Sequence, residues 1–279
     1  ALFILCFLDD IKIKINPNIR LIIMFALLIF LVNIFSIYIE KTGLAFLNLW
    51  LENIFFKNLF ILLCFLFIIN GSNLVDGFNG LLAIHLIIIN IVLVFINFDS
   101  ENQRLAWIIT GQIVILFSFL VFNFPKAKIF MGDSGSYLFG SLIALNIIET
   151  NNLNPEISSF FFCILLFYLF FEVFFSFFRK LYLKKSPLRP DKIHLHMLLY
   201  KFLERSGKFR DCNYLNSILI NFVYLCLISP AVFFIDNGLI CKYIFFSLLF
   251  FSYHLVLHPP PVARQPAPSS RPASPLRAA

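Results

Sequence analysis

The sequence has 279 residues, of which 60% are hydrophobic and 13% are charged, and it contains 39 phenylalanines. A soluble domain is about half apolar with about a quarter of its residues charged, so this composition excludes an ordinary soluble protein. The formal net charge of +7 does not indicate nucleic-acid binding, because the basic residues are interleaved with apolar runs and form no separate basic domain. Short strands of alternating polarity are absent, which argues against a membrane barrel.

We therefore expect an all-α, polytopic integral membrane protein. A helix needs about 20 apolar residues to cross roughly 30 Å of hydrocarbon, and the apolar runs have that scale. Residues 1–8 have the composition of the end of one span, and eight full spans are expected at residues 20–39, 54–70, 81–98, 105–123, 136–149, 158–178, 214–235 and 239–257.

The connections between these spans alternate in charge. Fifteen Lys or Arg residues fall in the connections at 9–20, 70–80, 123–136 and 179–213, and two fall in those at 40–53, 99–104, 149–158 and 236–238. Because Lys and Arg concentrate in cytoplasmic loops, the first set is predicted to be cytoplasmic. Every candidate chemical motif lies in that set, so the sequence predicts that the motifs meet at one membrane face.

The two ends of the chain differ from the middle. Residues 1–257 are expected to form one membrane domain, whereas residues 258–279 are rich in Pro, Ala, Ser and Arg and are expected to be a disordered tail or a cloning artefact. The first residues lack a basic start and a small-residue cleavage site, so we expect no cleavable signal peptide.

The segment KIFMGDSGSYLFG, at residues 128–140, allows two interpretations. Gly-Asp-Ser-Gly surrounds the nucleophile of trypsin-like proteases, but that chemistry needs a partner His and a β-barrel, and the flanking sequence predicts helix. Alternatively, Asp133 caps the helix that starts near Ser136, and the small residues that follow direct backbone amides at a phosphate. A capping aspartate with a purely structural role remains open.

A pair of acidic residues, Asp9 and Asp10, follows the first apolar fragment. Adjacent carboxylates repel each other, so both stay ionised only beside a cation, which is either Lys12 or Lys14 or a bound metal. Oxygen ligands favour Mg²⁺ or Mn²⁺ over Zn²⁺. The alternative is a solvated helix boundary.

The segment NGSNLVDGFNGLLA, at residues 70–83, places Asn73, Asp76 and Asn79 three residues apart. On a helix this spacing puts all three side chains on one face. Polar residues before a long apolar run are costly in a membrane unless they line a cavity, so the segment predicts a binding surface. Its glycines, Gly71, Gly77 and Gly80, would allow a close approach of backbone or ligand.

The segment RPDKIHLHMLLY, at residues 189–200, combines basic residues with two histidines. Arg189, Lys192, His194 and His196 suit an anionic substrate better than zinc, because further zinc ligands at suitable spacing are missing. Glu172 lies within an apolar run, where it would either face a polar cleft or remain neutral and hydrogen-bonded.

Together these motifs resemble the polyprenyl-phosphate N-acetylhexosamine-1-phosphate transferases, the superfamily of the WecA, TagO and MraY types. The matching segments, in chain order, are Leu8–Asp10 followed by Ile19–Leu21, Asn73–Leu81, Phe130–Ser136 and Ser186–His196. The Ser-Pro-x-x-Pro-Asp lead into the histidines resembles the WecA and TagO branch. Asn79, Met197 and Glu172 depart from the residues usual at these positions. Members usually have about ten or eleven spans, so the resemblance implies that N-terminal helices precede this chain.

The resemblance implies a Mg²⁺- or Mn²⁺-dependent enzyme of the bacterial cytoplasmic membrane, with its active site in cytoplasmic loops. It would transfer N-acetylhexosamine-1-phosphate from a UDP-sugar to undecaprenyl phosphate and release UMP, with a homodimer left open. The implied roles are catalysis for Asp9, Asp10 and Asp133, metal binding for Asp133 and Asp10, and substrate binding for Asn73, Asp76, Asn79, Lys12, Lys14, Arg20, Arg189, His194 and His196. The alternatives are a phospho-MurNAc-pentapeptide transferase, a membrane transporter and an inactive scaffold.

Overall fold

The computed structural model describes residues 17–100, 102–182, 184 and 194–257, which form helices and no strand. The helices are α2 (Pro17–Phe35), α3 (Ala45–Trp50), α4 (Ile54–Val75), α5 (Leu81–Asp99), α6 (Gln103–Asn123), α7 (Gly132–Leu153), α8 (Ser159–Leu165), α9 (Phe167–Tyr182), α10 (Leu195–Ser206), α11 (Cys212–Phe233) and α12 (Gly238–Leu257). The all-α fold is therefore confirmed for this part of the chain. The expected fragment at 1–8 and tail at 258–279 lie outside it.

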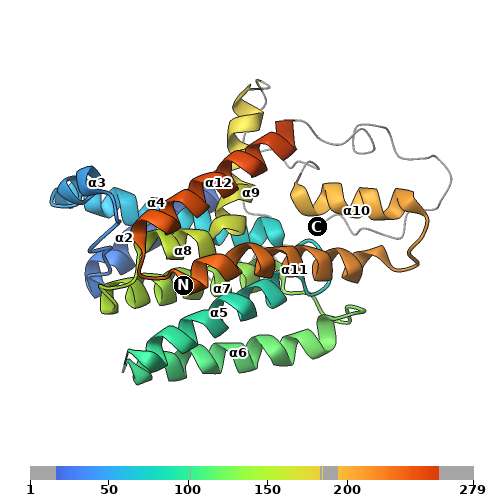
Figure 1. Ribbon diagram of the computed structural model, residues 1–279, viewed down its shortest axis with the longest axis horizontal. Helices are drawn as coiled ribbons and strands as arrows, with labels where there is room; N and C mark the ends of the chain where they lie inside the picture. Colours follow the sequence, from blue (N-terminus) through green and yellow to red (C-terminus); the bar gives the residue numbers. More distant parts are fainter. Residues whose placement is uncertain (1–16, 101, 183, 185–193, 258–279) are drawn as a thin grey trace.

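The long helices run between two ends of the molecule (Figure 1). The short helix α10 lies at one end, beside the start of α11, and α3 lies at the other. Helix α4 packs against α7 and α9, while α5 packs against α6, α7 and α11. This arrangement makes α4, α5 and α7 the centre of the bundle.

The predicted count of eight full spans is not confirmed. Four described helices, α4, α5, α6 and α11, are long and apolar enough to cross a membrane, and α8 with α9 would make a fifth span that is bent by 72°. Helices α2 and α12 contain apolar segments of fewer than 18 residues. Helix α7 has 22 residues, but it buries polar side chains such as Asn146 and Thr150, which make it less apolar than a typical span.

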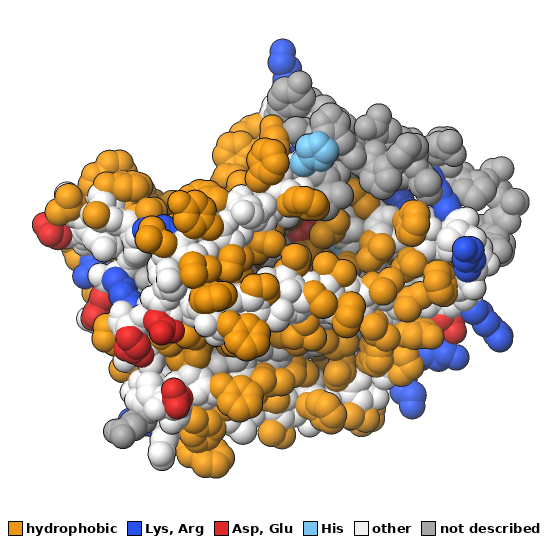
Figure 2. Space-filling model, viewed as in Figure 1, with side chains coloured by type: hydrophobic (Ala, Val, Ile, Leu, Met, Phe, Trp, Pro, Cys, Tyr) orange, Lys and Arg blue, Asp and Glu red, His pale blue; other side chains and the backbone are white. Residues whose placement is uncertain are grey.

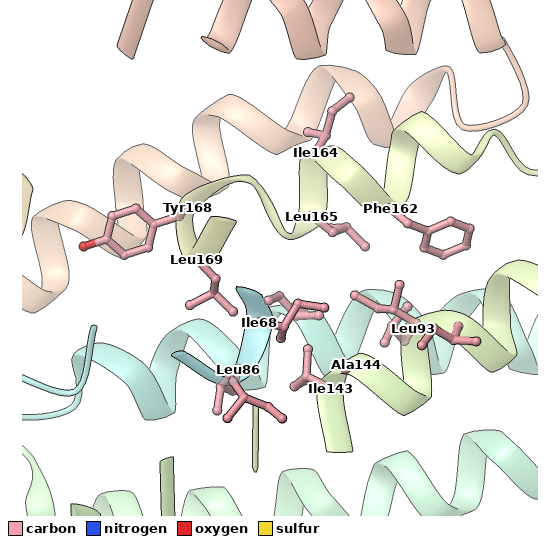
Figure 3. Close-up of a cluster of buried hydrophobic side chains, with 14 of the residues drawn as sticks. Ile68, Leu86, Leu93, Ile143, Ala144, Phe162, Ile164, Leu165, Tyr168 and Leu169 are labelled. Carbon is pink, nitrogen blue, oxygen red and sulfur yellow. The ribbon is translucent and has the colours of Figure 1, made fainter. Parts of the chain in front are cut away.

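Apolar side chains from several helices fill the centre of the bundle (Figure 3). Leu86 and Leu93 of α5 and Ile143 of α7 belong to one buried cluster, while Leu165 and Leu169 lie on either side of the break between α8 and α9. All five are fully buried. The dense packing of these apolar side chains against one another gives the bundle its shape.

Helix α4 approaches two neighbours too closely for a side chain at the contacts. A Cβ atom at Gly71 would lie 2.5 Å from the backbone oxygen of Leu169 in α9. On α7, a Cβ atom at Gly140 would lie 2.8 Å from the Ser72 hydroxyl of α4. Small residues allow such contacts between membrane helices, which associate by close packing and hydrogen bonding rather than by the hydrophobic effect. The close backbone approach predicted for Gly71 is thus confirmed.

Buried amides connect α5, α6 and α7. The Asn146 amide on α7 donates to Gln112 Oε1 on α6 at 2.7 Å and to Asn90 Oδ1 on α5 at 3.2 Å. Further along, the Asn97 amide on α5 donates to Thr150 Oγ1 on α7 at 2.8 Å. Each such bond between membrane helices contributes about 0.6 kcal/mol, so their main effect is to fix the relative heights of the three helices.

Charge divides the two ends of the bundle. Figure 2 shows a face covered largely by hydrophobic side chains, with blue Lys and Arg gathered at the α10 end as well as in smaller patches elsewhere, and red Asp and Glu mostly toward the opposite end. Lys126 and Lys128 are exposed in the connection from α6 to α7, and Glu149 and Glu156 are exposed at the other end. This asymmetry agrees with the loop-charge pattern.

We predict that Gly71→Ala destabilises the protein by about 1–3 kcal/mol, because the added methyl group overpacks the contact between α4 and α9. Gly111→Ala is the matched control. Gly111 lies in a membrane-spanning helix, and a Cβ atom there would meet nothing within 4 Å. Thermal unfolding in detergent should show a lower midpoint for Gly71→Ala and an unchanged or higher one for Gly111→Ala. Equal midpoints for the two variants would contradict the close packing.

Candidate functional site

Several of the predicted site residues meet at the α10 end of the bundle (Figure 1). This end contains the end of α4, the starts of α5, α7 and α11, and the connection from α6 to α7. A hydrogen bond from Asn73 to Ser136 joins two motifs that are 63 residues apart in the sequence, and another joins Asn79 to the start of α11. The prediction that the motifs share one end is therefore borne out for the described residues.

Asn73 and Asp133 form the centre of this end. Asn73 lies in the last turn of α4, and its Nδ2 donates to Asp133 Oδ1 at 2.8 Å and to Ser136 Oγ at 3.1 Å. The Ser136 hydroxyl in turn donates to the backbone oxygen of Asp133 at 3.1 Å. Two sequence motifs thus place an amide and a carboxylate side by side across the contact between α4 and α7.

The prediction that Asp133 caps a helix starting near Ser136 is wrong. Helix α7 begins at Gly132, and its N-cap residue is Met131, which makes no side-chain capping bond. Asp133 lies within the first turn, where a carboxylate is stabilised by the partial positive charge of the helix N-terminus. Gly132 has a φ angle of +69°, a conformation that side chains rarely tolerate, so glycine allows this turn into the helix. Ser134 lies on the same helix, and the residues that the structure describes form helices rather than the β-barrel of a trypsin-like protease.

The predicted polar face of Asn73, Asp76 and Asn79 is also wrong. Helix α4 ends at Val75, Asp76 is its C-cap residue, and Asn79 lies in the turn that follows. The Asn79 side chain donates to the backbone oxygen of Pro125 at 2.9 Å. The helix ends before Asn79, so Asn79 does not share a helical face with Asn73. Asn79 instead connects two neighbouring loops, whereas Asn73 faces Asp133.

Asn123 connects two of the site's loops, and sequence reasoning missed it. Its Oδ1 accepts from the backbone N–H of Gly80 at 2.6 Å, and its Nδ2 donates to the backbone oxygen of Ile129 at 2.7 Å. Gly80 is buried with a φ angle of +74°, and a Cβ atom there would lie 2.7 Å from the Phe124 ring. The only signal in the sequence was a polar residue at the end of an apolar run.

Glu172 joins the two histidines of the site. Its Oε2 lies 2.9 Å from His194 Nδ1, and its Oε1 lies 3.3 Å from His196 Nδ1. Oε1 also accepts from the backbone N–H of Leu195 at 2.9 Å, at the start of α10. The sequence left open a polar cleft or a neutral, hydrogen-bonded side chain. The structure buries Glu172 and pairs it with the two histidines of the 189–200 segment.

The histidines lie against the turn that follows Asp76. A Cβ atom at Gly77 would lie 3.7 Å from His196 Nε2, and the Phe78 ring meets the His196 ring edge-on at 5.7 Å between centroids. Phe78 also contacts Tyr200 of α10, at 5.1 Å. Burial, with the charge of Glu204 nearby, raises the pKa of Tyr200 and keeps its hydroxyl neutral. The Gly77–Phe78 turn thus connects the Asn73–Asp133 pair to the Glu172–histidine group.

The remaining predicted site residues fall outside the described part of the chain. They are Asp9, Asp10, Lys12, Lys14 and Arg189, together with the side chain of Arg20 at the start of α2. Among the described residues, no three His, Cys, Asp or Glu side chains are grouped to hold a metal ion. Asp133 and Asn73 nevertheless bring a carboxylate and a carboxamide together, and both groups carry the oxygen ligands that Mg²⁺ takes.

The sequence profile of glycosyl transferase family 4 matches residues 1–151 of this chain, which is more than half of its length. The chain belongs to glycosyl transferase family 4. That match includes the Asp9–Asp10, Asn73–Leu81 and Phe130–Ser136 motifs, so the resemblance inferred from the residues is confirmed.

Similar proteins carry two different names. An undecaprenyl-phosphate alpha-N-acetylglucosaminyl 1-phosphate transferase of Thermotoga maritima is 29% identical over 188 residues, covering 67% of this chain and 57% of that protein. A phospho-N-acetylmuramoyl-pentapeptide-transferase of Leuconostoc mesenteroides is 40% identical over 79 residues, covering 28% of this chain and 25% of that protein. Another, of Dictyoglomus turgidum, is 33% identical over 148 residues, covering 51% and 48%. The segments that match this family 4 chain thus cover between 25% and 57% of the length of these three relatives.

We predict that Asn123→Ala destabilises this family 4 protein by about 1–3 kcal/mol, because it leaves the buried Gly80 N–H without an acceptor. Asn33→Ala is the control, since Asn33 is exposed on α2 and its amide donates only to the Ile29 carbonyl one turn away. Asn33→Ala should lower the stability of the folded protein by less than about 0.5 kcal/mol. Thermal unfolding in detergent compares the two, and equal losses would contradict the role of Asn123 in joining the loops.

Proposed function

We propose that this protein transfers N-acetylhexosamine-1-phosphate from a UDP-sugar to a polyprenyl phosphate such as undecaprenyl phosphate. An oxygen of the lipid phosphate attacks the β-phosphorus of the UDP-sugar. The bond from that phosphorus to the bridging oxygen breaks, and UMP leaves with the electron pair. The product is a lipid diphosphate sugar, the type of intermediate that starts the synthesis of a cell-envelope polysaccharide.

The observation that carries the proposal is the pairing of Asn73 with Asp133 at the start of α7, beside the turn that contacts His196. Phosphoryl transfer depends mainly on positioning and on neutralising negative charge. The arrangement supplies oxygen ligands on one side and imidazoles on the other. Family membership and the name of the Thermotoga maritima relative support the same reaction.

The residues present fit a magnesium ion. Asp133 would hold it with Asp10, as the resemblance implies, and the adjacent Asn73 carboxamide could contribute its oxygen after rotating from its hydrogen bond to Asp133. When bound, Mg²⁺ neutralises charge on the diphosphate. Asn73 is therefore assigned to the diphosphate side of the site rather than to the uridine side.

The other residues receive roles from their chemistry and position. Asp9 or Asp10 orients or deprotonates the lipid phosphate, and Lys12, Lys14 and Arg20 attract it. Asp76 holds the uridine or sugar, with Asn79 acting through the loop that it fixes to Pro125. Arg189, His194 and His196 bind the diphosphate or the sugar. The Lys and Arg residues of its loops support an orientation in which this end faces the cytoplasm of a bacterium, where soluble UDP-sugar is available.

A second candidate is the transfer of phospho-MurNAc-pentapeptide, because several similar proteins carry that name. The Ser-Pro-x-x-Pro-Asp sequence before His194 favours the N-acetylhexosamine branch instead. The two reactions use the same site chemistry and differ in the sugar that is recognised, so substrate tests separate them.

The decisive test supplies membranes that contain the protein with polyprenyl phosphate, Mg²⁺ and a panel of UDP-sugars that includes UDP-MurNAc-pentapeptide. We expect UMP release and a lipid-linked sugar phosphate with a UDP-N-acetylhexosamine, and loss of both when Mg²⁺ is chelated. Turnover of UDP-MurNAc-pentapeptide alone would favour the second candidate. Transport of a solute without UMP release would instead indicate a transporter, and no turnover with any sugar would contradict the proposed enzyme.

We predict that Asp133→Asn lowers the rate of UMP release by about 100-fold or more, because it removes the negative charge that would hold the metal ion, and with it the cation that neutralises the diphosphate. Asp211→Asn is the matched control. Asp211 is exposed at the N-cap of α11, and Asn caps a helix about as well as Asp. Normal turnover in Asp133→Asn, at equal amounts of folded protein in the membrane, would overturn the metal assignment.

A further inference from the structure

Glu172 is a carboxylic acid buried within the apolar helix α9, with 2% of its surface exposed. An ionisable group in such a segment is costly unless it is paired, and Glu172 is surrounded by three donors. These are His194 Nδ1 and the Leu195 N–H, each at 2.9 Å, and His196 Nδ1 at 3.3 Å. One carboxylate therefore orders both histidines and the backbone that starts α10.

These contacts determine which nitrogen of each histidine is free for other partners. An ionised carboxylate only accepts hydrogen bonds, so His194 Nδ1, which is hydrogen-bonded to Glu172, must carry a proton. We assign the proton of His196 to Nδ1 in the same way, from its ion-pair contact with Glu172. In each neutral ring Nε2 is then the acceptor, and it points away from Glu172. The two rings are nearly parallel, with an interplanar angle of 3° and centroids 5.4 Å apart, so the pair presents two Nε2 atoms in a fixed orientation.

The Nε2 atom of His196 faces the rest of the candidate site. It lies 3.7 Å from the position that a Cβ atom would take at Gly77, the residue after Asp76. The Tyr168 hydroxyl lies 3.3 Å from Nδ1 of the same ring and adds a second contact on the buried side. The histidine ring is thus held from the interior of the bundle, with its other nitrogen toward the Asp76 turn.

We propose that Glu172 is a positioning residue, which orients His194 and His196 so that their Nε2 atoms bind the diphosphate of the nucleotide sugar. This inference rests on the function proposed above. A carboxylate at Nδ1 fixes the tautomer of a histidine. It also stabilises the imidazolium that forms when Nε2 takes up a proton from solvent, and the Nε2–H then donates to an anionic oxygen of the diphosphate. The substrate never touches Glu172, which acts through the two imidazoles.

The kinetic test compares Glu172→Gln with Ser176→Ala. Ser176 lies one turn further along α9 and is also buried, with 4% of its surface exposed. Glu172→Gln should raise the apparent KM for the UDP-sugar by about 10-fold or more, the loss typical of removing a partner that orients a histidine ligand. Ser176→Ala should leave KM unchanged. Glu172→Asp, which keeps the charge, should have a KM between those of wild type and Glu172→Gln.

A purely structural role predicts a different result. Less folded enzyme would lower Vmax in proportion to the amount of protein and leave KM unchanged, and that outcome would overturn the inference. A second comparison uses a protein in which His194 and His196 are both replaced by Gln. If Glu172 acts through the histidines, adding Glu172→Gln to that protein should raise KM no further. An additive increase would also overturn the inference.

A measurement independent of turnover separates this inference from the proposed function. In ¹⁵N-histidine NMR spectra of the membrane-embedded protein, we expect two rings protonated at Nδ1 in wild type, and loss of that signature in Glu172→Gln but not in Ser176→Ala. Unchanged spectra in Glu172→Gln would contradict the positioning role even if the enzyme is active. Absence of UMP release from wild type, with the expected spectra, would contradict the proposed function and leave the histidine geometry established.

Discussion

The close contact of α4 with both α7 and α9 determines where the candidate site forms. Gly71 and Gly140 allow these three helices to approach until backbone meets backbone or a short side chain. Asn73 follows Gly71 by two residues, and Ser136 precedes Gly140 by about one helical turn, so the contact sets the height at which Asn73 meets the start of α7. In lipid, where apolar burial gives little preference between helix pairs, such small-residue contacts decide the arrangement.

The same arrangement explains how a bundle this apolar tolerates polar groups in its interior. Glu172 is compensated by two imidazoles and a backbone amide, and His85 of α5 pairs with Asn221 of α11 at 3.3 Å. Both of these side chains have a partner that lies outside their own helix. Polar residues therefore mark the contacts between particular helices, and at the α10 end these contacts coincide with the candidate site.

The sequence predicted the helical fold and the common end of the motifs, because hydropathy and loop charge are local properties. It placed Asn73, Asp76 and Asn79 on one helical face, since periodicity alone does not reveal that α4 stops at Val75. It identified Glu172 as a charge in an apolar run but not its histidine partners, which lie more than 20 residues away. Asn123 was missed altogether, because its two bonds go to backbone groups of separate loops.

The break between α8 and α9 explains how Glu172, which lies in an apolar helix, comes to contact the histidines of the candidate site. A span predicted at 158–178 is instead two helices bent by 72°, joined at Leu166. Such a bend frees backbone carbonyls, which in a membrane must find new partners. The Tyr224 hydroxyl of α11 donates to the Leu165 carbonyl at 2.7 Å and satisfies one of them. Because α9 leaves the break in a new direction, Tyr168 and Glu172, one turn apart, both reach the histidines of α10.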